Sequence, residues 1–300
     1  MKILYYNITY KCNNDCIFCA ADHGYNTSNA EMKIQDFCSA ISMQKIVKDD
    51  RIIINGGEPT VHPDFIDFLK IAYSSGAYID LYTNGRKFKD ANFTEKVISY
   101  SPMLIRIPLF GSKASIHDKL TGKSGSFNDT MQGIENIIAL KGNLPVRLEI
   151  KLLLSKATCF ENKNIYWDLL AKLPNSFYIS FNPLLISNRV KSNKDIMIEP
   201  CSDSLLKSMD LISEIKKAGR EVSLSLIPFC ILPKELYPKG VNRKTAEIYT
   251  EPGMMKEVKN DLTSPKCRYC SYKYICPGFP ASYINYMGDG EVKPIIIPAK

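Results

Sequence analysis

The stretch ILYYNITYKCNNDCIFC (residues 3–19) places three cysteines directly after an apolar run. Residues 3–8 are apolar enough for a buried strand, and Cys12, Cys16 and Cys19 follow in C-x3-C-x2-C spacing. Soft thiolate ligands gathered this tightly select iron–sulfur clusters, zinc or copper(I). Three ligands leave one coordination position open, and open positions are where metal sites do chemistry. The sequence therefore predicts a reactive metal centre on the loop after the first strand.

Strand-like and helix-like segments alternate from this stretch onward. Strands are predicted at residues 2–10, 51–54, 77–82, 103–109, 145–154 and 177–181, and helices at residues 31–48, 64–75, 92–100, 126–141 and 162–173. The strands are short and continuously apolar, as parallel strands covered by helices are. Such strand–helix units wind into a parallel sheet with right-handed connections. The number of units falls short of a closed barrel of eight, so we predict an α/β fold with a partial (β/α)6 TIM-like barrel.

The rhythm changes after residue 183. A helix is predicted at residues 204–218 and a strand at residues 221–226. From Pro228 onward the chain carries further prolines at positions 233, 238, 252 and 265 and few long apolar runs. We expect a small, irregular C-terminal segment that metal ligation holds together.

Composition limits the partners and the compartment. The 300 residues are 45% hydrophobic and 23% charged, with a formal net charge of +8. The basic residues are scattered, without the dense block that follows a phosphate backbone, so no nucleic-acid partner is predicted. No apolar run approaches the roughly 18 residues of a membrane span, and no cleavage site follows Met1. We expect a cytoplasmic protein with no membrane partner.

The ten cysteines indicate metal or redox chemistry rather than disulfides in a cytoplasmic chain of this size. A second group, Cys267, Cys270 and Cys276, has C-x2-C-x5-C spacing. Cys230 is the nearest upstream candidate for a fourth ligand, with Cys201 in reserve. Taken alone, this group could equally be a structural zinc site. The isolated Cys38 and Cys159 are predicted to be buried apolar thiols.

Two turns follow the second and third predicted strands. The first is Asn55-Gly56-Gly57-Glu58-Pro59, and the second is Thr83-Asn84-Gly85. Glycines let the backbone approach a ligand closely, and the Glu58 carboxylate is an acceptor for an amine. Parallel strands end at the same edge of a sheet, so both turns should lie near the cysteine loop. The loop histidines His62 and His117 are predicted to be structural, and no catalytic acid or base is assigned.

At this point the sequence resembles the radical S-adenosylmethionine (SAM) superfamily. Cys12, Cys16, Phe18 and Cys19 match the family's C-x3-C-x-(aromatic)-C pattern, residues 56–59 match its Gly-Gly-Glu-Pro motif, and residues 83–85 match its Thr-Asn-Gly turn. The resemblance covers roughly residues 1–185. There is one departure: Pro108-Leu109-Phe110-Gly111 stands where many members have Ser-Leu-Asp-Gly. A carboxylate of some relatives is therefore missing at the end of the fourth strand.

The resemblance implies a [4Fe–4S] cluster held by Cys12, Cys16 and Cys19, with its fourth iron open to SAM. It implies that Gly56, Gly57 and Glu58 hold the methionine amine and that Thr83 and Asn84 contact the same cofactor. Arg106 is a candidate for the SAM carboxylate, and the alternative is a solvent-facing or salt-bridged strand residue. The implied reaction is reductive cleavage of SAM to a 5′-deoxyadenosyl radical that abstracts a substrate hydrogen. The electron would come from a donor such as flavodoxin or ferredoxin.

The C-terminal cysteines resemble the auxiliary-cluster extensions called SPASM and twitch. This predicts a radical SAM core at residues 1–200 and an auxiliary domain at residues 201–300. There are too few cysteines for two auxiliary clusters, so one auxiliary [4Fe–4S] cluster is expected, with Cys230, Cys267, Cys270 and Cys276 as ligands.

Three functions are compatible with the sequence. Members with SPASM-like ends often modify peptide side chains, by oxidative cross-linking, epimerisation or similar maturation. The first strand begins at residue 2, so we expect no separate leader-peptide-binding domain in front. This expectation weakens the case for a peptide substrate. The second candidate is therefore the same radical chemistry on a small metabolite such as an amino sugar. A zinc-stabilised binding protein is the alternative of another class.

Overall fold

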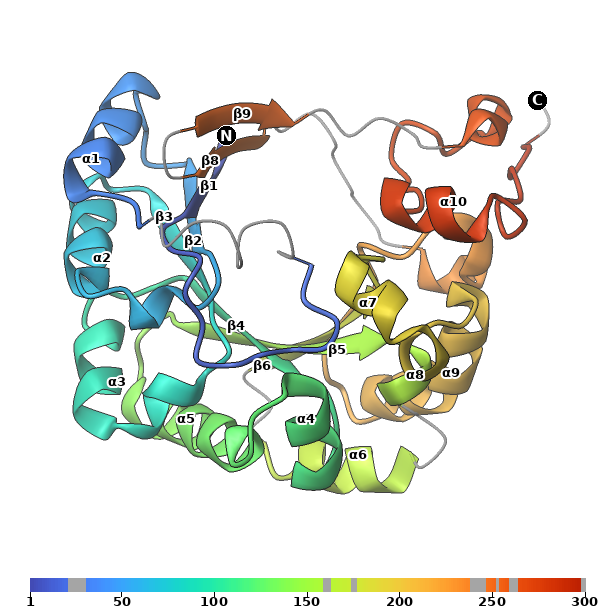
Figure 1. Ribbon diagram of the computed structural model, residues 1–300, viewed down its shortest axis with the longest axis horizontal. Coiled ribbons are helices and arrows are strands. Elements are labelled where there is room, and N and C mark those ends of the chain that lie inside the picture. Colours follow the sequence, from blue (N-terminus) through green and yellow to red (C-terminus); the bar gives the residue numbers. More distant parts are fainter. Residues whose placement is uncertain are drawn as a thin grey trace.

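A parallel β-sheet runs through the computed structural model, which describes residues 1–20, 31–158, 163–173, 177–237, 247–251, 254–258 and 264–297 (Figure 1). The sheet in these residues has nine strands in the order β7-β6-β5-β4-β3-β2-β1-β8-β9. They are β1 (Ile3–Asn7), β2 (Arg51–Asn55), β3 (Tyr78–Tyr82), β4 (Leu104–Leu109), β5 (Arg147–Leu154), β6 (Phe177–Pro183), β7 (Val222–Ser223), β8 (Glu247–Glu251) and β9 (Met254–Val258). Neighbours from β7 through β8 are parallel, and β9 pairs antiparallel with β8. The sheet is open, which confirms the partial barrel.

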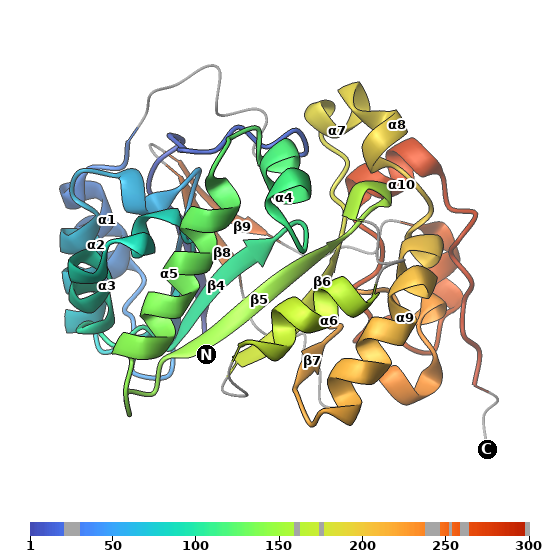
Figure 2. The ribbon, with the colours of Figure 1, turned by 90° about the horizontal axis from the view of Figure 1, so that it is seen from below.

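Helices cover the outer face of this curved sheet (Figures 1 and 2). Helices of eight or more residues are α1 (Ile34–Met43), α2 (Phe65–Ser74), α3 (Ala91–Ile98), α4 (Ala114–Thr121), α5 (Ser126–Leu140), α6 (Lys163–Ala171) and α9 (Cys201–Lys217). The shorter helices are α7 (Asn188–Ser192), α8 (Lys194–Met197) and α10 (Ala281–Met287). Single 3-10 turns form at η1 (Pro59–Val61), η2 (Arg86–Lys89), η3 (Lys156–Thr158), η4 (Phe229–Ile231), η5 (Lys234–Leu236) and η6 (Pro265–Tyr269).

The core lies between the sheet and these helices. In α2, Phe65, Phe68, Leu69 and Ala72 are all buried, because spacings of three and four residues bring them to one face of the helix. Phe68 meets Phe37 of α1 edge-to-face, with ring centroids 4.9 Å apart. Each such buried side chain contributes about 1.5–3 kcal/mol to folding. This packing fixes the strands whose carboxyl ends carry the site.

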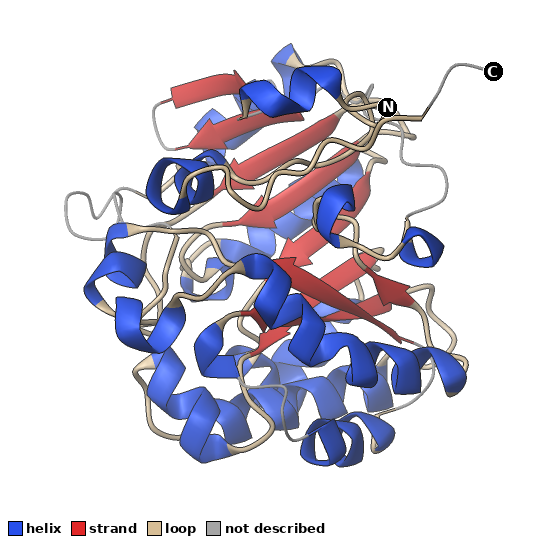
Figure 3. Ribbon diagram, turned by 90° about the vertical axis from the view of Figure 1, so that its right-hand side faces the viewer, coloured by secondary structure: helices blue, strands red, loops and turns tan. Residues whose placement is uncertain are grey.

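The six predicted strands are present in the predicted order, and the expected strand near residue 221 is β7, which joins the same sheet (Figure 3). Beyond residue 200, α9 still packs against α6 and β5. The division of the chain at residue 200 therefore stays a prediction. The sequence reasoning missed α4, α7, α8, α10 and the β8–β9 hairpin. Cys159 lies outside the described residues. Within the described part of the chain, no helix has both the length and the hydropathy of a membrane span.

Candidate functional site: a thiol-lined cavity at the ends of the strands

The cysteine segment, residues 12–19, crosses the inner side of the sheet after β1 (Figure 1). Its backbone is held by α4, because the Asp15 N–H donates to the Thr121 carbonyl at 2.8 Å and the Ile17 N–H to the Leu120 carbonyl at 3.0 Å. From α7, Arg189 reaches the Asp15 carboxylate at 2.5 Å and the Cys16 carbonyl at 3.0 Å. Two helices distant in sequence therefore fix the path of the segment.

Arg86, at the start of η2, ties the same segment to α5. Its guanidinium donates to the Asn14 side-chain oxygen at 3.1 Å and to the Asn13 carbonyl, and it pairs with Asp129 at 3.0 Å. Asn84 donates from its side-chain nitrogen to the Asn13 side-chain oxygen at 2.6 Å. Sequence reasoning missed Arg86, although its position directly after the Thr-Asn-Gly turn was an available signal.

Gly56 and Gly57 permit close packing against the residues that lead into the cysteine segment. A Cβ at Gly57 would lie 2.3 Å from the Lys11 carbonyl oxygen, and a Cβ at Gly56 would lie 2.4 Å from the Thr9 carbonyl oxygen. The Gly57 N–H donates to the Thr9 carbonyl at 2.7 Å, and the Glu58 N–H to the Lys11 carbonyl at 2.8 Å. The close approach that these glycines allow is thus to the chain itself. Whether they also contact a ligand remains a prediction.

Glu58 joins the turn after β2 to the turn after β3. One carboxylate oxygen accepts hydrogen bonds from the Thr60 hydroxyl at 2.6 Å and the Thr83 hydroxyl at 2.7 Å. The other accepts from the Asn84 backbone N–H at 2.6 Å. The side chain is 1% exposed, and burial raises the pKa of its carboxyl. Glu58 therefore sets the relative positions of the two turns.

A cavity of about 330 Å³ brings the predicted core-site residues together. Its lining includes Cys12, Cys16, Cys19, Gly56, Gly57, Glu58, Thr83, Asn84 and Arg106. Burial raises the pKa of the Cys12 thiol to about 11 and that of the Cys16 thiol further still. Thiols with raised pKa values, as those of Cys12 and Cys16 are, favour their thiolate forms only beside a strong positive charge, which metal ions provide. The donor set fits the three-thiolate, open-position cluster that the sequence implied.

Arg106 lines this cavity with its guanidinium already engaged. It pairs with Asp80 at 2.8 Å and with Glu149 at 2.8 Å, and it lies over the Tyr82 ring at 4.6 Å. The Tyr178 hydroxyl donates to the same Glu149 carboxylate at 2.7 Å. In the structure, Arg106 is a salt-bridged strand residue. The sequence had left this open as the alternative to a contact with the SAM carboxylate. Its contact with a SAM carboxylate stays a prediction.

His117 is buried beneath the cysteine segment, with 1% of its surface exposed. Its Nδ1 accepts from the Phe110 N–H at 3.3 Å, and its Nε2 lies 3.4 Å from the Ser126 hydroxyl. Ser126 also donates to the Asn14 side-chain oxygen at 3.2 Å. Burial lowers the pKa of His117 to about 4, so the imidazole is neutral at pH 7. His117 does not line the cavity, and its contacts are those of a structural support.

The C-terminal cysteine group, Cys230, Cys267, Cys270 and Cys276, lines a second, smaller cavity. The Phe229 and Gly278 N–H groups donate to the Cys276 sulfur at 3.3 and 3.4 Å. The thiols surround the cavity, and no three His, Cys, Asp or Glu side chains of the described residues meet closely enough to hold a single metal ion.

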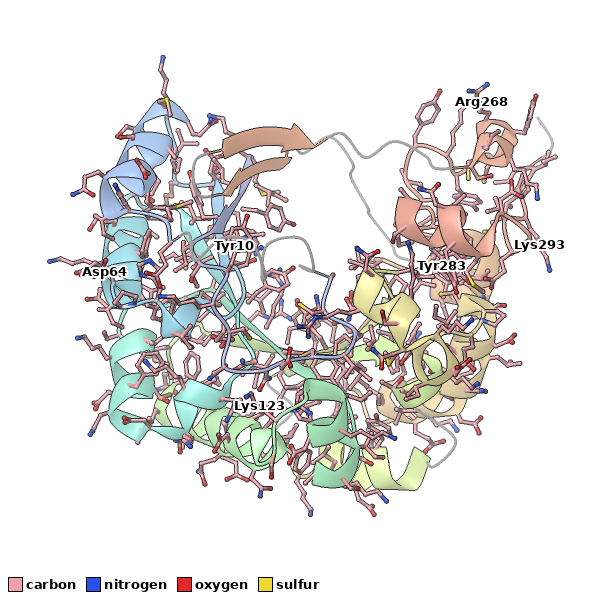
Figure 4. All side chains as sticks on the ribbon, viewed as in Figure 1. Tyr10, Asp64, Lys123, Arg268, Tyr283 and Lys293 are labelled. Atoms are coloured by element: carbon pink, nitrogen blue, oxygen red, sulfur yellow. The ribbon has the colours of Figure 1, made fainter. Side chains whose placement is uncertain are left out.

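Cys201 does not line this second cavity. It is buried in the first turn of α9, where its N–H donates to the Tyr283 hydroxyl at 2.9 Å. Tyr283 lies on α10 (Figure 4). Of the two candidates for a fourth ligand, the structure groups Cys230 with the C-terminal triplet.

The fold and the first cavity define a partial α/β barrel with three thiols at the carboxyl ends of its strands. Residues 6–147, just under half of the chain, match the family model described as the radical SAM superfamily.

Curated relatives match over less than half of the chain. An AdoMet-dependent heme synthase of Methanosarcina barkeri is 23% identical over 147 residues, which are 49% of this chain and 41% of the synthase. Mycofactocin maturase MftC of Mycolicibacterium smegmatis is 28% identical over 134 residues, or 45% of this chain and 33% of the maturase. The matched region thus spans well under two thirds of these relatives.

Solved structures share the fold over more of the chain. Native anSMEcpe with bound AdoMet and Cp18Cys peptide superposes with a TM-score of 0.66 and 17% identity, covering 93% of this chain and 89% of that one. SuiB of Streptococcus suis bound to S-adenosylmethionine gives a TM-score of 0.65 and 14% identity, covering 94% and 74%. At these identities the similarity establishes the fold alone.

Proposed function

We propose that the protein is a radical SAM maturase that modifies a peptide side chain. The observation that carries this proposal is the first cavity, where three thiols meet the turns after β2 and β3. Cys12, Cys16 and Cys19 hold a [4Fe–4S] cluster in this proposal. When bound, the cluster and SAM supply a 5′-deoxyadenosyl radical that takes a hydrogen atom from the substrate.

The surrounding residues position the cofactor and exclude water. Glu58 and the backbone at Gly56 and Gly57 face the methionine amine, and Thr83 and Asn84 hold polar groups of the same molecule. The Thr83 hydroxyl and the Asn84 backbone N–H both donate to the Glu58 carboxylate, so the turns after β2 and β3 act as one rigid unit. A preorganised unit of this kind orients a cofactor without having to reorder when the cofactor binds.

The C-terminal cysteine group holds one auxiliary [4Fe–4S] cluster in this proposal, within a C-terminal domain at residues 201–300. Two N–H groups already donate to the Cys276 sulfur, and hydrogen bonds to ligand sulfurs tune the potential of iron–sulfur clusters. An external donor such as flavodoxin or ferredoxin supplies the reducing electron, in the cytoplasm.

A peptide substrate is supported by relatives named for mycofactocin maturation and by a fold neighbour solved with a bound peptide. The heme synthase relative supports the second candidate, the same radical chemistry on a small metabolite. Because each relative matches this chain only in part, both are proposals about this protein.

Anaerobic reconstitution tests the proposal. We expect a brown protein with about eight irons, as two four-iron clusters require. After reduction with dithionite it should form 5′-deoxyadenosine from SAM, measured by mass spectrometry. Cys16→Ala should form none, while Cys38→Ala, which alters a thiol outside both cavities, should match the wild type. A colourless protein with tightly bound zinc would refute the proposal and would support a zinc-stabilised binding protein instead.

The auxiliary cluster has a separate test. Cys267→Ala or Cys270→Ala should keep about half of the iron and retain SAM cleavage, because the first cavity is unaltered. Full iron retention in either variant would show that the C-terminal thiols are not ligands.

A further inference from the structure

Exposed aromatic and aliphatic side chains gather beside the second cavity. Tyr269 and Tyr274 are 77% and 76% exposed, more than any other Phe, Tyr or Trp side chain that the structure describes, and Ile296 is 72% exposed. The stretches that carry them lie side by side, because the Ser271 N–H donates to the Ile295 carbonyl at 2.8 Å. Large apolar side chains exposed together on one surface are typical of a binding surface for another molecule.

Basic side chains accompany these apolar ones. Arg268 and Lys293 are exposed and lie at the same end of the molecule, whereas Lys273 is half-buried (Figure 4). The Lys273 ammonium lies over the Tyr274 ring, 5.1 Å from the ring centre. In the described part of the chain, no carboxylate forms an ion pair with any of these three cations. The C-terminal patch comprises six residues: Arg268, Tyr269, Lys273, Tyr274, Lys293 and Ile296.

The acidic residues near the patch are engaged elsewhere. Residues 264–297 contain four basic and two acidic residues. Of the two acids, Asp289 pairs with Lys266 at 3.0 Å. Glu291 accepts from the Ser202 N–H of α9 at 2.8 Å and from the Tyr283 hydroxyl. The patch therefore presents an uncompensated positive charge.

The patch residues alternate with the cysteines of the second cavity. Arg268 and Tyr269 lie between the first two cysteines of the C-terminal triplet. Lys273 and Tyr274 lie between the second and the third. Lys273 and Lys293 also line the cavity itself. A protein that docks on the patch is therefore within a few residues of the thiols that are proposed to hold the auxiliary cluster.

Charge and composition decide which partner the patch fits. Tyrosine and arginine are enriched in protein–protein interfaces. A second copy of this chain, docked patch to patch, would place three cations against three cations, and like charges oppose such a contact. An acidic protein is complementary instead, and complementary charge speeds the formation of transient complexes. Electron-transfer encounters are of this transient kind and bury less than about 1,200 Å², so a small patch is sufficient.

We propose that the C-terminal patch docks an acidic electron-carrier protein of the flavodoxin or ferredoxin class, which exchanges electrons with the auxiliary cluster. This inference rests on the proposed function, because it requires a cluster in the second cavity. It adds the surface at which the electron carrier binds. Each exchange moves one electron: the partner that gives it is oxidised by one electron, and the partner that receives it is reduced by one.

Binding of known carriers to the reconstituted protein tests the proposal. Biolayer interferometry measures the dissociation constants of an acidic flavodoxin and of a plant-type ferredoxin, with calcium-free calmodulin as an acidic partner that has no redox cofactor. We expect at least one carrier to bind at low salt and to bind tenfold more tightly than calmodulin. Its affinity should fall about tenfold between about 0.01 M and about 0.1 M salt, because the screening length falls from about 30 Å to about 10 Å.

Charge reversal assigns the binding to the patch. Arg268→Glu/Lys273→Glu/Lys293→Glu should weaken carrier binding at least tenfold at low salt. The control Lys48→Glu/Lys70→Glu/Lys96→Glu changes the net charge equally at exposed lysines outside the patch and should stay within threefold of the wild type. Iron content and the urea midpoint show whether the patch variant is folded. If it is not, the corresponding glutamine variant is measured instead, with a smaller loss expected.

Tyr269→Ser/Tyr274→Ser separates the apolar contribution from the charge. This variant should weaken carrier binding at both salt concentrations and keep the same dependence on salt. An affinity equal to that of the wild type would show that the exposed rings do not belong to the interface.

Four outcomes overturn the proposal. They are no binding of either carrier, equal binding of calmodulin, an equal loss of binding in the patch variant and its control, and patch-dependent binding to anionic lipid vesicles in place of the carriers. Failure of the proposed function has a different signature, because the wild type would then form no 5′-deoxyadenosine with dithionite, a reductant that needs no docking surface. Formation of 5′-deoxyadenosine together with any of the four outcomes refutes the docking surface alone.

Discussion

Acid should destabilise the protein through His117. The imidazole is buried beneath the cysteine segment and accepts a hydrogen bond from the Phe110 N–H. Protonation at Nδ1 would turn this acceptor into a second donor facing the same N–H. It would also place a positive charge near Arg86. Burial lowers the pKa of His117 most, Asp118 raises it in part, and Arg86 lowers it further. The native structure therefore resists protonation at this position.

The size of the effect follows from the two pKa values. His117 has a pKa of about 4 in the folded protein and about 6.5 in an exposed chain. Because the folded protein binds this proton less tightly, His117 contributes stability that is fully present above pH 6.5 and is lost as the pH falls through 4. The difference corresponds to about 3.4 kcal/mol, at about 1.36 kcal/mol per pKa unit.

Urea unfolding at a series of pH values measures this loss. Between pH 7 and pH 4, the wild type should lose about 3 kcal/mol more unfolding free energy than His117→Gln, which has no proton to gain. With a urea slope of about 3 kcal/mol/M for a chain of this size, the extra fall in the urea midpoint is about 1 M. Carboxylates titrate in both proteins, so the difference between them isolates the histidine.

Nuclear magnetic resonance checks the pKa directly. The chain has three histidines, and the resonance absent from His117→Gln is assigned to His117. We expect that resonance to titrate with a midpoint near pH 4. A midpoint near 6.5, or parallel pH profiles for the two proteins, would refute the reasoning.

Three further outcomes are expected. Gly57→Ala should lower both iron content and stability to urea, because its Cβ would lie 2.3 Å from the Lys11 carbonyl oxygen in the loop after β1. Unchanged values would show that this loop shifts freely. Cys230→Ala should lose the auxiliary iron while Cys201→Ala keeps it, and the reverse result would exchange the two assignments. Arg86→Met should lower the yield of the first cluster, whereas Lys89→Met, which alters a more exposed partner of the same aspartate, should not.

The sequence was informative where local pattern decides structure. The strand β2 is a short run with three consecutive isoleucines, and continuous apolar runs of this kind are typical of parallel strands that helices cover. The turns at residues 56–58 and 83–84 were expected beside the cysteine segment, because parallel strands share one carboxyl edge. The cavity lining places them there.

The hydrogen bonds that hold the cysteine segment in place could not be predicted from local sequence patterns. Ser126 bonds to Asn14, and Arg189 bonds to Asp15, across more than 100 residues of chain in each case. Such contacts depend on how whole elements pack, and neither residue type is distinctive at its position. The hairpin β8–β9 was missed for a related reason: its sequence is charged, and pairing of β8 with β1 is what makes it part of the sheet.

Electron paramagnetic resonance of the reconstituted and reduced Cys267→Ala/Cys270→Ala protein tests whether the first cavity holds an iron–sulfur cluster that binds SAM. This variant leaves the first cavity unaltered and removes two of the four thiols at the second, so we assign its cluster signal to Cys12, Cys16 and Cys19. We expect a reduced [4Fe–4S] signal whose g values change when SAM is added, because SAM occupies the open iron. A signal that SAM leaves unaltered, or a protein without any iron signal, would contradict it.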